Sequence, residues 1–472
     1  MLARVQMEVD RDYVCPQALL GVLPKGSRVL LESTLTNTQH RWAILAYNPD
    51  SIFLSRNGQT SLNGVKLEGE NPFVIFSRLL ESEEPFAPIT ELPFVGGWIG
   101  CLAYESVRFL ESVPTKHEHC DFDLLFYKVE SCYVFDLVEE RLFYISSSGR
   151  IPEMKAYKAK ARLMQKHPDR LSSPRRVLRS FIEKNGKYSN FSEADYCRSI
   201  ELLKEHILDG ESYQANLSQR WTFPSDAEPH EIYRELSELS PVPFAGFFEW
   251  GDALSIISAS PERLFEIRKR QIFTRPIAGT RRCGNQEETA RFFSELRHDA
   301  KENAEHAMLV DLARNDLGRV CQYGTVKISQ FMELVPYSTV IHTESEIEGI
   351  LKRGASFYEV MKALFPGGTI TGVPKIRTME ILNTLEPCER GVYTGSMGYW
   401  SRCGHADFNI MIRPVICKPG WAHTHAGGGI TIKSDPKREY KETWNKALPQ
   451  LAAITRTWRS DGSLAPPNLP LP

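Results

Sequence analysis

Two glycine-rich stretches in the second half of this 472-residue chain contain the residues best suited to binding an anion. The first, FPGGTITGVPK, covers 365–375 and ends on Lys375. The second, AGGGI, covers 426–430 and follows shortly after Arg413. Glycine-rich turns offer bare backbone N–H groups to a carboxylate or a phosphate, and the two cations add positive charge. The sequence therefore predicts a binding site for a small anionic molecule.

Neither stretch carries a nucleotide-binding signature. In the first, Gly372 is followed by Val-Pro-Lys, whereas a Walker loop has Lys-Ser or Lys-Thr after its last glycine. In the second, Gly427, Gly428 and Gly429 are consecutive, whereas the dinucleotide fingerprint spaces its glycines. We therefore expect a small polyanionic metabolite as the ligand rather than ATP or NAD.

Two pairs of acidic residues are placed to bind a metal ion. Glu439 and Glu442 are three residues apart on one predicted helix, and Glu302 and Glu305 have the same spacing on another, so each pair shares a helix face. A hard cation such as Mg²⁺ takes one or two carboxylates together with ligand oxygens and water. The alternative is a solvated acidic face that pairs with neighbouring lysines such as Lys446.

A third acidic residue, Glu262, lies in the turn Ser-Pro-Glu-Arg at 260–263. A carboxyl group that is partly removed from water has a raised pKa and suits a general acid. The alternative is an ordinary salt bridge across the turn between Glu262 and Arg263.

The elements that position these residues show the patterns of a mixed α+β protein with many strands. Residues 1 to about 145 alternate apolar and polar positions between turns. Beyond them, the patterns predict a helix capped by Ser192 and closed by Gly210, a strand over 213–223, paired strands over 254–282, a helix over about 287–314 and a last helix that begins at Pro436 and is kinked at Pro449. The repeated strand–helix–strand order of a parallel sheet is missing.

Composition and sequence patterns divide the chain into four regions. They are an N-terminal region (1–150), a polar and basic linker with a possible helix (151–188), the region with the candidate chemistry (189–459) and a tail rich in Pro, Gly and Ser (460–472) that we expect to be disordered.

Composition narrows the choice of partners and compartment. A net charge of −2 gives no electrostatic reason to bind nucleic acid or an anionic membrane surface. The first residues lack the apolar run of a signal peptide, and no stretch approaches the length of a membrane span. The ten cysteines are scattered, as is typical of reduced thiols. We therefore expect a cytoplasmic protein.

Taken together, the motifs resemble those of the chorismate-utilising enzymes, strongly over about 190–455. The segments that carry the resemblance are 260–263 (SPER), 275–280 (RPIAGT), 304–319 (AEHAMLVDLARNDLGR), 365–375, 390–395 (RGVYTG) and 439–442 (EYKE). Residues 1–145 are similar to the more variable N-terminal region of that family, including Leu-Leu-Glu-Ser ending at Ser33, a position like those of its tryptophan-binding region. The resemblance implies an α+β fold in which two large antiparallel β-sheets pack as a sandwich with flanking helices.

The resemblance also implies roles for individual residues. Glu305 and Glu442 would hold Mg²⁺, with Glu439 close by, and Glu262 would protonate the hydroxyl group that leaves ring carbon 4 of chorismate. His342 would lie beside the ring. The two carboxylates of chorismate would be bound by a set that includes Thr371, Gly372, Lys375, Tyr393, Gly395, Arg413, Gly427, Gly428 and Gly429.

Two positions bear on the nucleophile. Relatives that add water carry a lysine base where this chain has Gln214, and a glutamine cannot deprotonate water. Ammonia needs no such base, so the chain resembles the ammonia-adding branches of the family. Ala278 replaces the lysine that attacks the ring covalently in well-known aminodeoxychorismate synthases, so direct displacement is expected. Because the chain has no recognisable glutaminase domain, ammonia would come from a separate glutamine amidotransferase subunit.

The ammonia-adding branches differ in their product. The segments 213–220, 241–246 and 365–372 resemble aminodeoxychorismate synthases, which make 4-amino-4-deoxychorismate for 4-aminobenzoate and folate synthesis. Ala278, in contrast, is the residue found in anthranilate synthases, which serve tryptophan synthesis. We expect the 4-amino product, with anthranilate as the alternative. A regulatory relative that only binds tryptophan is disfavoured, because the chain retains Glu262, Glu305 and Arg413.

Overall fold

A computed structural model describes most of the chain. The described residues are 6–35, 40–69, 71–84, 92–114, 120–147, 149–165, 188–282, 291, 295, 297, 300–336 and 340–456. The predicted tail at 460–472 lies outside them, as does the predicted beginning of the helix over 287–314.

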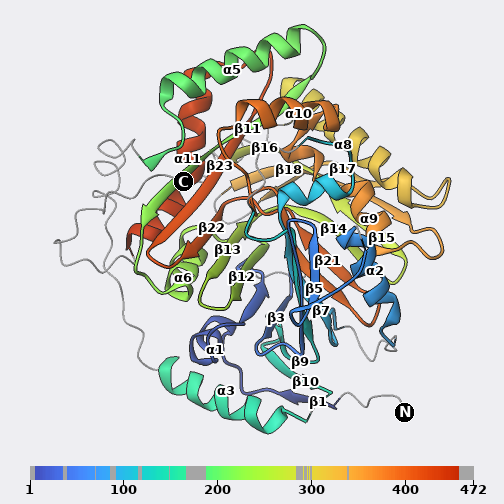
Figure 1. Cartoon of the computed structure of the whole chain (residues 1–472), viewed down its shortest axis with the longest axis vertical. Helices are drawn as coiled ribbons and strands as arrows, with labels where there is room; N and C mark the ends of the chain where they lie inside the picture. The colour runs from blue at the N-terminus through green and yellow to red at the C-terminus, as the bar shows by residue number, and fades with distance from the viewer. Residues whose placement is uncertain are drawn as a thin grey trace.

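Two large antiparallel β-sheets form the centre of the molecule (Figure 1). The order of strands in the first sheet is β1 (Gln6–Asp10), β10 (Arg141–Ser146), β9 (Ser131–Asp136), β3 (Trp42–Ala46), β2 (Val29–Glu32), β12 (Phe244–Trp250), β13 (Leu254–Ser260), β22 (Pro414–Lys418), β23 (Trp421–Ile430), β11 (Gln214–Pro224) and β19 (Gly372–Val373). The order in the second is β16 (Ile277–Arg282), β18 (Val340–Ile350), β15 (Gln271–Arg275), β14 (Arg263–Arg268), β21 (Ala406–Asn409), β20 (Ser396–Ser401), β7 (Gly97–Leu102), β8 (Leu124–Val129), β4 (Ser51–Arg56), β5 (Gln59–Leu62) and β6 (Val65–Lys66), and β17 (Lys327–Pro336) pairs with β18.

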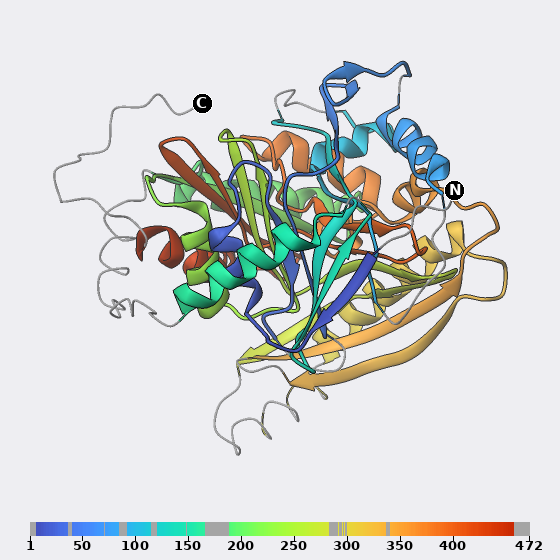
Figure 2. The ribbon, with the colours of Figure 1, turned by 90° about the horizontal axis from the view of Figure 1, so that it is seen from below.

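Helices cover the outer faces of both sheets. Those that pack on or beside the first sheet are α1 (Pro16–Val22), α3 (Ile151–Gln165), α5 (Glu193–Leu208), α6 (Pro229–Leu239) and α11 (Pro436–Arg456). On the second sheet, α8 (Ala300–Val320) contacts β16, β17 and β18. Helix α9 (Phe357–Leu364) packs against α8, and α2 (Pro72–Ser82) packs against α9. The remaining elements are η1 (Tyr104–Phe109), η3 (Gly368–Ile370) and α10 (Lys375–Leu385). Seen from below in Figure 2, the long pair β17 and β18 (yellow to orange) runs along the side away from α11 (red).

The two sheets face each other across a continuous apolar core. Side chains from β2, β3, β9, β12 and β13 of the first sheet meet side chains from β7, β8 and β20 of the second, and the largest of them include Phe248, Tyr127 and Tyr399. One further core lies under the helices of each outer face, and a smaller one lies beneath α5 and α10. The structure therefore confirms the predicted α+β fold of two packed antiparallel sheets.

Local sequence patterns placed several elements correctly. The Ser192 hydroxyl caps α5 by accepting from the Asp195 backbone N–H at 3.1 Å, and Gly210 follows the helix with a positive φ of 78°. Strand β11 coincides with the strand predicted over 213–223. Helix α8 runs to Val320, six residues beyond the predicted end, and α11 continues through Pro449 as one helix.

The N-terminal region and the region after 188 share both sheets. Strands β2 and β12 pair across Leu30 and Phe247 in the first sheet, and β7 and β20 pair across Gly100 and Gly398 in the second. Each sheet therefore contains strands from before and from after the predicted boundary at 151–188. The boundary divides the sequence but does not separate the sheets. Within the described residues, no helix combines the length and the apolar character needed to cross a bilayer.

Candidate active site

The second glycine stretch belongs to a strand rather than to the predicted turn. Gly427, Gly428 and Gly429 lie in β23 and pair with β11, where Asn216 stands opposite Gly429. Strand β22 pairs with β23 only over 421–424, so among the described strands the other edge of 426–430 has no neighbour. Apart from the Gly427 carbonyl, which accepts from Lys446 at 3.1 Å, backbone polar groups along this edge are available to a ligand.

Gly427 and Gly429 of β23 are required because side chains lie directly over them. A Cβ at Gly427 would stand 2.5 Å from Asn216 Oδ1 and 2.8 Å from the Tyr393 hydroxyl, and a Cβ at Gly429 would stand 2.5 Å from Gln214 Nε2. A Cβ at Gly428 would only reach ordinary contact, 3.4 Å from Glu439 Oε2. Residues from β11, α11 and the turn before β20 therefore converge on this strand.

The first glycine stretch is a turn that is held against β11. The Thr371 hydroxyl donates to the Gly367 carbonyl at 3.0 Å, and the Thr371 carbonyl accepts from the Asn216 backbone N–H at 2.9 Å. Gly372 has a φ of 147°, and a Cβ there would stand 2.1 Å from the Gln214 carbonyl. Only glycine fits between the turn and the strand at this position.

Lys375 begins α10 at the end of this turn. Its ammonium group donates to Asp316 on α8 at 2.8 Å, and both side chains are nearly buried. The lysine is therefore engaged by a carboxylate of this chain, and a ligand that uses it would have to share it with Asp316.

Glu262 is the most perturbed carboxyl group beside the first turn. It is 6% exposed, and it accepts a hydrogen bond from the Thr369 hydroxyl at 2.7 Å. Burial raises its pKa to about 7. The hydrogen bond from Thr369 lowers the pKa, whereas the nearby Glu344 charge raises it. A carboxyl group with this pKa is available in its neutral, proton-donating form near neutral pH.

The alternative of a turn salt bridge between Glu262 and Arg263 is wrong. The Arg263 guanidinium forms two hydrogen bonds to Asp407, at 2.9 and 3.0 Å, and also contacts Glu266 at 3.0 Å. The turn itself is held by Ser260, whose hydroxyl donates to the Ile410 carbonyl at 2.6 Å. Arg263 therefore faces away from the Glu262 carboxyl group.

His342 and Arg413 bring a neutral ring and a cation to the same region. His342 is buried on β18, and burial together with the Arg413 charge lowers its pKa to about 4, so the imidazole is neutral at physiological pH. Ala278 on β16 pairs with Thr343, the residue after His342. Arg413 adopts a φ of 55° and donates to the Ser240 hydroxyl at 3.3 Å, but no carboxylate of the described residues pairs with it. A partly buried guanidinium without such a partner favours an anionic ligand.

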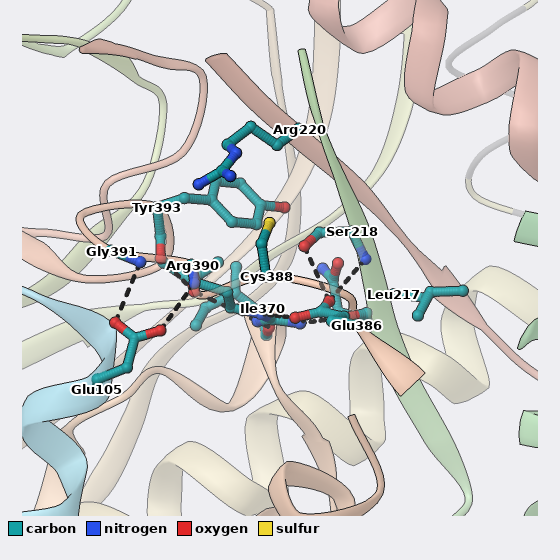
Figure 3. Close-up of polar contacts among 12 residues, drawn as sticks. Glu105, Leu217, Ser218, Arg220, Ile370, Glu386, Cys388, Arg390, Gly391 and Tyr393 are labelled. Carbon is teal, nitrogen blue, oxygen red and sulfur yellow. Dashed lines mark hydrogen bonds and ion pairs between the residues drawn. The ribbon is translucent and has the colours of Figure 1, made fainter. Parts of the chain in front are cut away.

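Tyr393 and Gly395 lie in the turn between α10 and β20, which a buried ion pair holds in place. The Arg390 guanidinium is bonded twice to Glu386, at 2.8 Å each, and also donates to the carbonyls of Asn216 and Ile370 (Figure 3). The Tyr393 ring stacks on His425 with an interplanar angle of 10°. A Cβ at Gly395 would stand 2.1 Å from the Leu102 carbonyl, so the turn also fits tightly against β7.

The carboxylates predicted to hold a metal lie on two different helices. Glu305 is half-buried on α8. Glu439 and Glu442 lie on α11, where Lys446 pairs with Glu442 at 2.9 Å and donates to the Gly427 carbonyl at 3.1 Å. In the part of the chain that the structure describes, no three His, Cys, Asp or Glu side chains are grouped closely enough to form a metal site. The alternative interpretation of these glutamates, pairing with a neighbouring lysine, is thus present at Glu442.

Ser33 lies away from these residues, beside a cavity of about 530 Å³ between the two sheets. The serine hydroxyl accepts from the Leu35 backbone N–H at 3.1 Å and is buried. The cavity is lined by both apolar and charged side chains, among them Arg263, Arg275 and Asp407. Pro243 and Phe244 of the segment 241–246 also line this cavity, so it adjoins the Ser33 position that resembles the tryptophan-binding region of the family.

A model of the chorismate binding enzyme family matches residues 27–452. The chain belongs to this family. Anthranilate synthase component 1 of Thermus thermophilus is 37% identical over 433 residues, covering 90% of this chain and 91% of that protein. Aminodeoxychorismate synthase component 1 of Bacillus subtilis is 36% identical over 441 residues, covering 90% and 91%.

Solved structures agree with this family assignment. Anthranilate synthase component I of Streptococcus pneumoniae superimposes with a TM-score of 0.74 at 30% identity, covering 88% of this chain and 93% of that one. The menaquinone-specific isochorismate synthase of Escherichia coli, with a TM-score of 0.69 at 16% identity, covers 95% and 94% and shares the fold.

Three residues of this chorismate binding enzyme were not assigned from its sequence. Thr369, inside the first glycine stretch, holds Glu262. Arg390 begins the segment 390–395 that carries the resemblance, but the sequence did not predict its ion pair with Glu386. Asn216 follows Gln214 by two residues on β11, so strand alternation alone would have placed both on one face.

Proposed function

We propose that this chorismate binding enzyme aminates chorismate with ammonia, and that Glu262 is its general acid. The observation that carries the proposal is the buried Glu262 carboxyl group with a pKa of about 7, beside a turn of the glycine stretch and held by Thr369. Hydroxide is a poor leaving group, so its departure requires a proton donor that is neutral at working pH. Arg413 and the free edge of β23 supply positive charge and N–H donors for the two carboxylates of the substrate.

The proposed step balances as chorismate plus ammonia giving the amino product plus water. A C–N bond forms at ring carbon 4 while the C–O bond to the hydroxyl group breaks. The Glu262 proton leaves with the hydroxyl group as water, and the new ammonium group returns a proton to the Glu262 carboxylate. Ala278 offers no nucleophile, so no covalent enzyme intermediate takes part. Neutral His342 lies beside the ring without adding a second charge.

Mg²⁺ is the proposed cofactor, held by Glu305 and Glu442 with Glu439 close by. These donors are hard oxygen ligands, and the Glu439 carboxylate lies against Gly428 on the ligand-binding strand, so the residues fit such an ion. When bound, the ion would neutralise a substrate carboxylate and the charge that develops on it. Lys446 pairs with Glu442 and donates to the Gly427 carbonyl. It would have to release the Glu442 carboxylate before that group could bind the ion.

The metal assignment has a direct test. Replacing Glu305 with alanine should reduce chorismate turnover and should raise the Mg²⁺ concentration needed for half-maximal rate. Fluorescence or calorimetric titration of Mg²⁺ into the protein with chorismate gives a second readout. A Glu305→Ala protein with full turnover at low Mg²⁺ would remove Glu305 from the site.

The proposed source of ammonia is a separate glutamine amidotransferase subunit. The relatives from Thermus thermophilus and Bacillus subtilis are both named component 1 of a synthase, which supports a second component. Gln214 supports ammonia over water, since no lysine base stands at that position. The chain alone should therefore use ammonium salts but not glutamine, and glutamine-dependent turnover without a partner would contradict this part of the proposal.

The proposed product is 4-amino-4-deoxychorismate, for 4-aminobenzoate and folate synthesis. Support comes from the segments 213–220, 241–246 and 365–372, which resemble aminodeoxychorismate synthases. Anthranilate is the second candidate, because Ala278 matches anthranilate synthases and several similar relatives carry that name. The initial test is loss of chorismate in the presence of Mg²⁺ and ammonium, and a protein that leaves chorismate unchanged would contradict both candidates.

A further inference from the structure

A buried carboxylate from the N-terminal region holds the turn that carries Tyr393. Glu105, on η1, is 6% exposed, and its two oxygens accept the backbone N–H groups of Arg390 and Gly391 at 2.7 and 3.0 Å (Figure 3). The Tyr104 N–H donates to the Gly391 carbonyl at 2.7 Å. Both polar groups of the Gly391 backbone are therefore bonded to η1.

The turn needs support from outside because its backbone is strained. Thr394 has a φ of 61°, in the left-handed region that a β-branched residue rarely adopts, and Gly391 has a φ of 59°. A residue such as Thr394 that is held there costs about 1–3 kcal/mol, and it persists only where the surroundings fix it. The Thr394 N–H donates to the Met411 carbonyl at 2.7 Å, which fixes one end of the turn, and Glu105 fixes the other. The conformation of the turn therefore depends on bonds from other segments.

The Tyr393 side chain is the part of the turn that reaches the glycine strand. Its ring stacks on His425, and a Cβ at Gly427 would stand 2.8 Å from its hydroxyl. Tyr393 is two residues from Gly391 and next to Thr394, so a shift of the turn moves it directly. The place of this hydroxyl beside β23 thus follows from the conformation of the turn.

Glu105 differs from a buried carboxylate that stabilises only its own region. Asp123 accepts from Arg108 of η1 at 2.6 Å and from the Gly58 N–H at 3.0 Å, and both partners belong to the N-terminal region. Glu105 accepts from the Cys120 thiol of that region at 3.2 Å, but its two shorter bonds come from the turn. Those two bonds therefore join the N-terminal region to the candidate site.

We propose that Glu105 is a positioning residue for chorismate, because it holds the turn 390–395 and thereby places Tyr393 at the edge of β23. The proposal rests on the proposed function and on the assignment of Tyr393 to the substrate carboxylates. Glu105 acts through the turn and takes no part in the bond changes at the ring. It therefore affects the binding of chorismate more than the rate at which bound chorismate reacts.

The test compares chorismate binding with the stability of the fold. Glu105→Gln keeps the size of the side chain but places an NH₂ group against one of the two backbone N–H groups, so the turn loses a bond. The Kd for chorismate, measured by calorimetry with Mg²⁺ and without ammonium, should rise by about tenfold, the effect of losing a hydrogen bond to a charged group. The KM for chorismate should rise with it, while kcat changes by less than about threefold.

Asp123→Asn is the matched control. It weakens a buried ion pair within the N-terminal region, so it should lower the free energy of unfolding and leave the Kd for chorismate within about twofold of wild type. Urea unfolding of both variants measures the two stabilities.

A double-variant cycle shows whether the effect passes through the tyrosine. Tyr393→Phe removes the hydroxyl and should raise the Kd for chorismate by itself. Because Glu105 acts by placing that hydroxyl, adding Glu105→Gln to Tyr393→Phe should raise the Kd by less than about twofold further. Independent increases that multiply would overturn the proposal.

The other results also decide. A Glu105→Gln protein that binds chorismate like wild type would overturn the proposal, and a loss of stability like that of Asp123→Asn would then assign Glu105 a structural role. If Glu105→Gln does not fold, Glu105→Asp, which keeps the charge but withdraws the oxygens by one methylene group, is measured in its place and should also raise the Kd. A wild-type protein that binds chorismate but does not consume it with ammonium would contradict the proposed function and leave the comparison of Kd values intact.

Discussion

Glu262 is the residue on which the proposed chemistry most depends, and its pKa sets the pH range of activity. An ordinary glutamate is almost fully ionised above pH 6, but burial raises the pKa of Glu262 to about 7, so a large neutral fraction remains there. As the pH rises through about 7 the acid loses its proton. We therefore expect kcat/KM for chorismate, measured at constant free ammonia, to fall above that pH.

The corresponding variant tests the assignment to this residue. Glu262→Gln keeps the shape but has no acidic proton, and we expect kcat to fall by about 10²–10⁴-fold, the range typical of a lost general acid. The fall in rate above pH 7 should disappear with it. Glu266→Gln, on the neighbouring strand and paired with Arg263, is a control for changes in local charge. A Glu262→Gln protein with the wild-type pH profile would contradict the role of the acid.

Arg413 is expected to bind the substrate rather than to stabilise the fold. Its charge is partly buried without a described carboxylate partner, and burial lowers its pKa. Arg413→Gln should therefore raise the KM for chorismate by about tenfold or more, in line with the loss of a charged hydrogen bond, while the free energy of unfolding stays the same or increases. Arg413→Lys, which keeps the charge, should be affected less. Equal losses of stability and of affinity would indicate a structural role instead.

At the scale of elements, the Arg390–Glu386 ion pair joins β11, η3 and the turn that carries Tyr393. Ser218 also donates to Glu386 through its N–H and its hydroxyl, both at 2.8 Å, and Glu105 on η1 accepts from the Arg390 backbone N–H at 2.7 Å. The network therefore connects the turn that carries Tyr393 to β11, η1 and η3.

Removing one member of this buried pair should cost more than removing both. Arg390→Met leaves the Glu386 carboxylate buried without its cation, and we expect a loss of about 3–5 kcal/mol in the free energy of unfolding. The double variant with Glu386→Gln should recover part of that loss. Urea unfolding of the two single variants and the double variant measures the coupling. Strictly additive losses would show that the two groups do not act as a pair.

Strand β23 offers a matched pair of substitutions. A Cβ at Gly427 would overlap Asn216 Oδ1 at 2.5 Å and the Leu217 carbonyl at 2.7 Å, whereas a Cβ at Gly428 would reach only 3.4 Å from Glu439. We expect Gly427→Ala to lower kcat/KM for chorismate by at least about tenfold, as a displacement near 1 Å does in other active sites. Gly428→Ala should have a much smaller effect. Equal activities of the two variants would show that the contacts over Gly427 do not position the site.

At the scale of the whole molecule, the sequence predicted elements better than it predicted contacts. Residue alternation and capping signals identified β11 and the Ser192 end of α5, because these depend on neighbours a few residues away. The bond from Arg390 to Glu105 joins residues 285 positions apart, and no local pattern reports such a distance. The same limit applies to the sheets, which combine strands from both sides of the predicted boundary.

The candidate site shows the same contrast. Motif types identified Glu262 and the glycines, since an acid and bare backbone are recognisable in a sequence. The engagement of Lys375 by Asp316 was not foreseen, because their pairing depends on how α8 and α10 pack. The glycines of 426–430 were expected in a turn, but β11 supplies a partner strand along their whole length, so they extend.

The reaction that we propose for this chain is amination of chorismate at ring carbon 4. The most direct test is chromatography of the product formed from chorismate, Mg²⁺ and excess ammonium, with and without an aminodeoxychorismate lyase. We expect aminodeoxychorismate, which becomes 4-aminobenzoate only when the lyase is present. Fluorescent anthranilate that forms without the lyase would contradict the claim, and would assign the chain to the branch that Ala278 resembles.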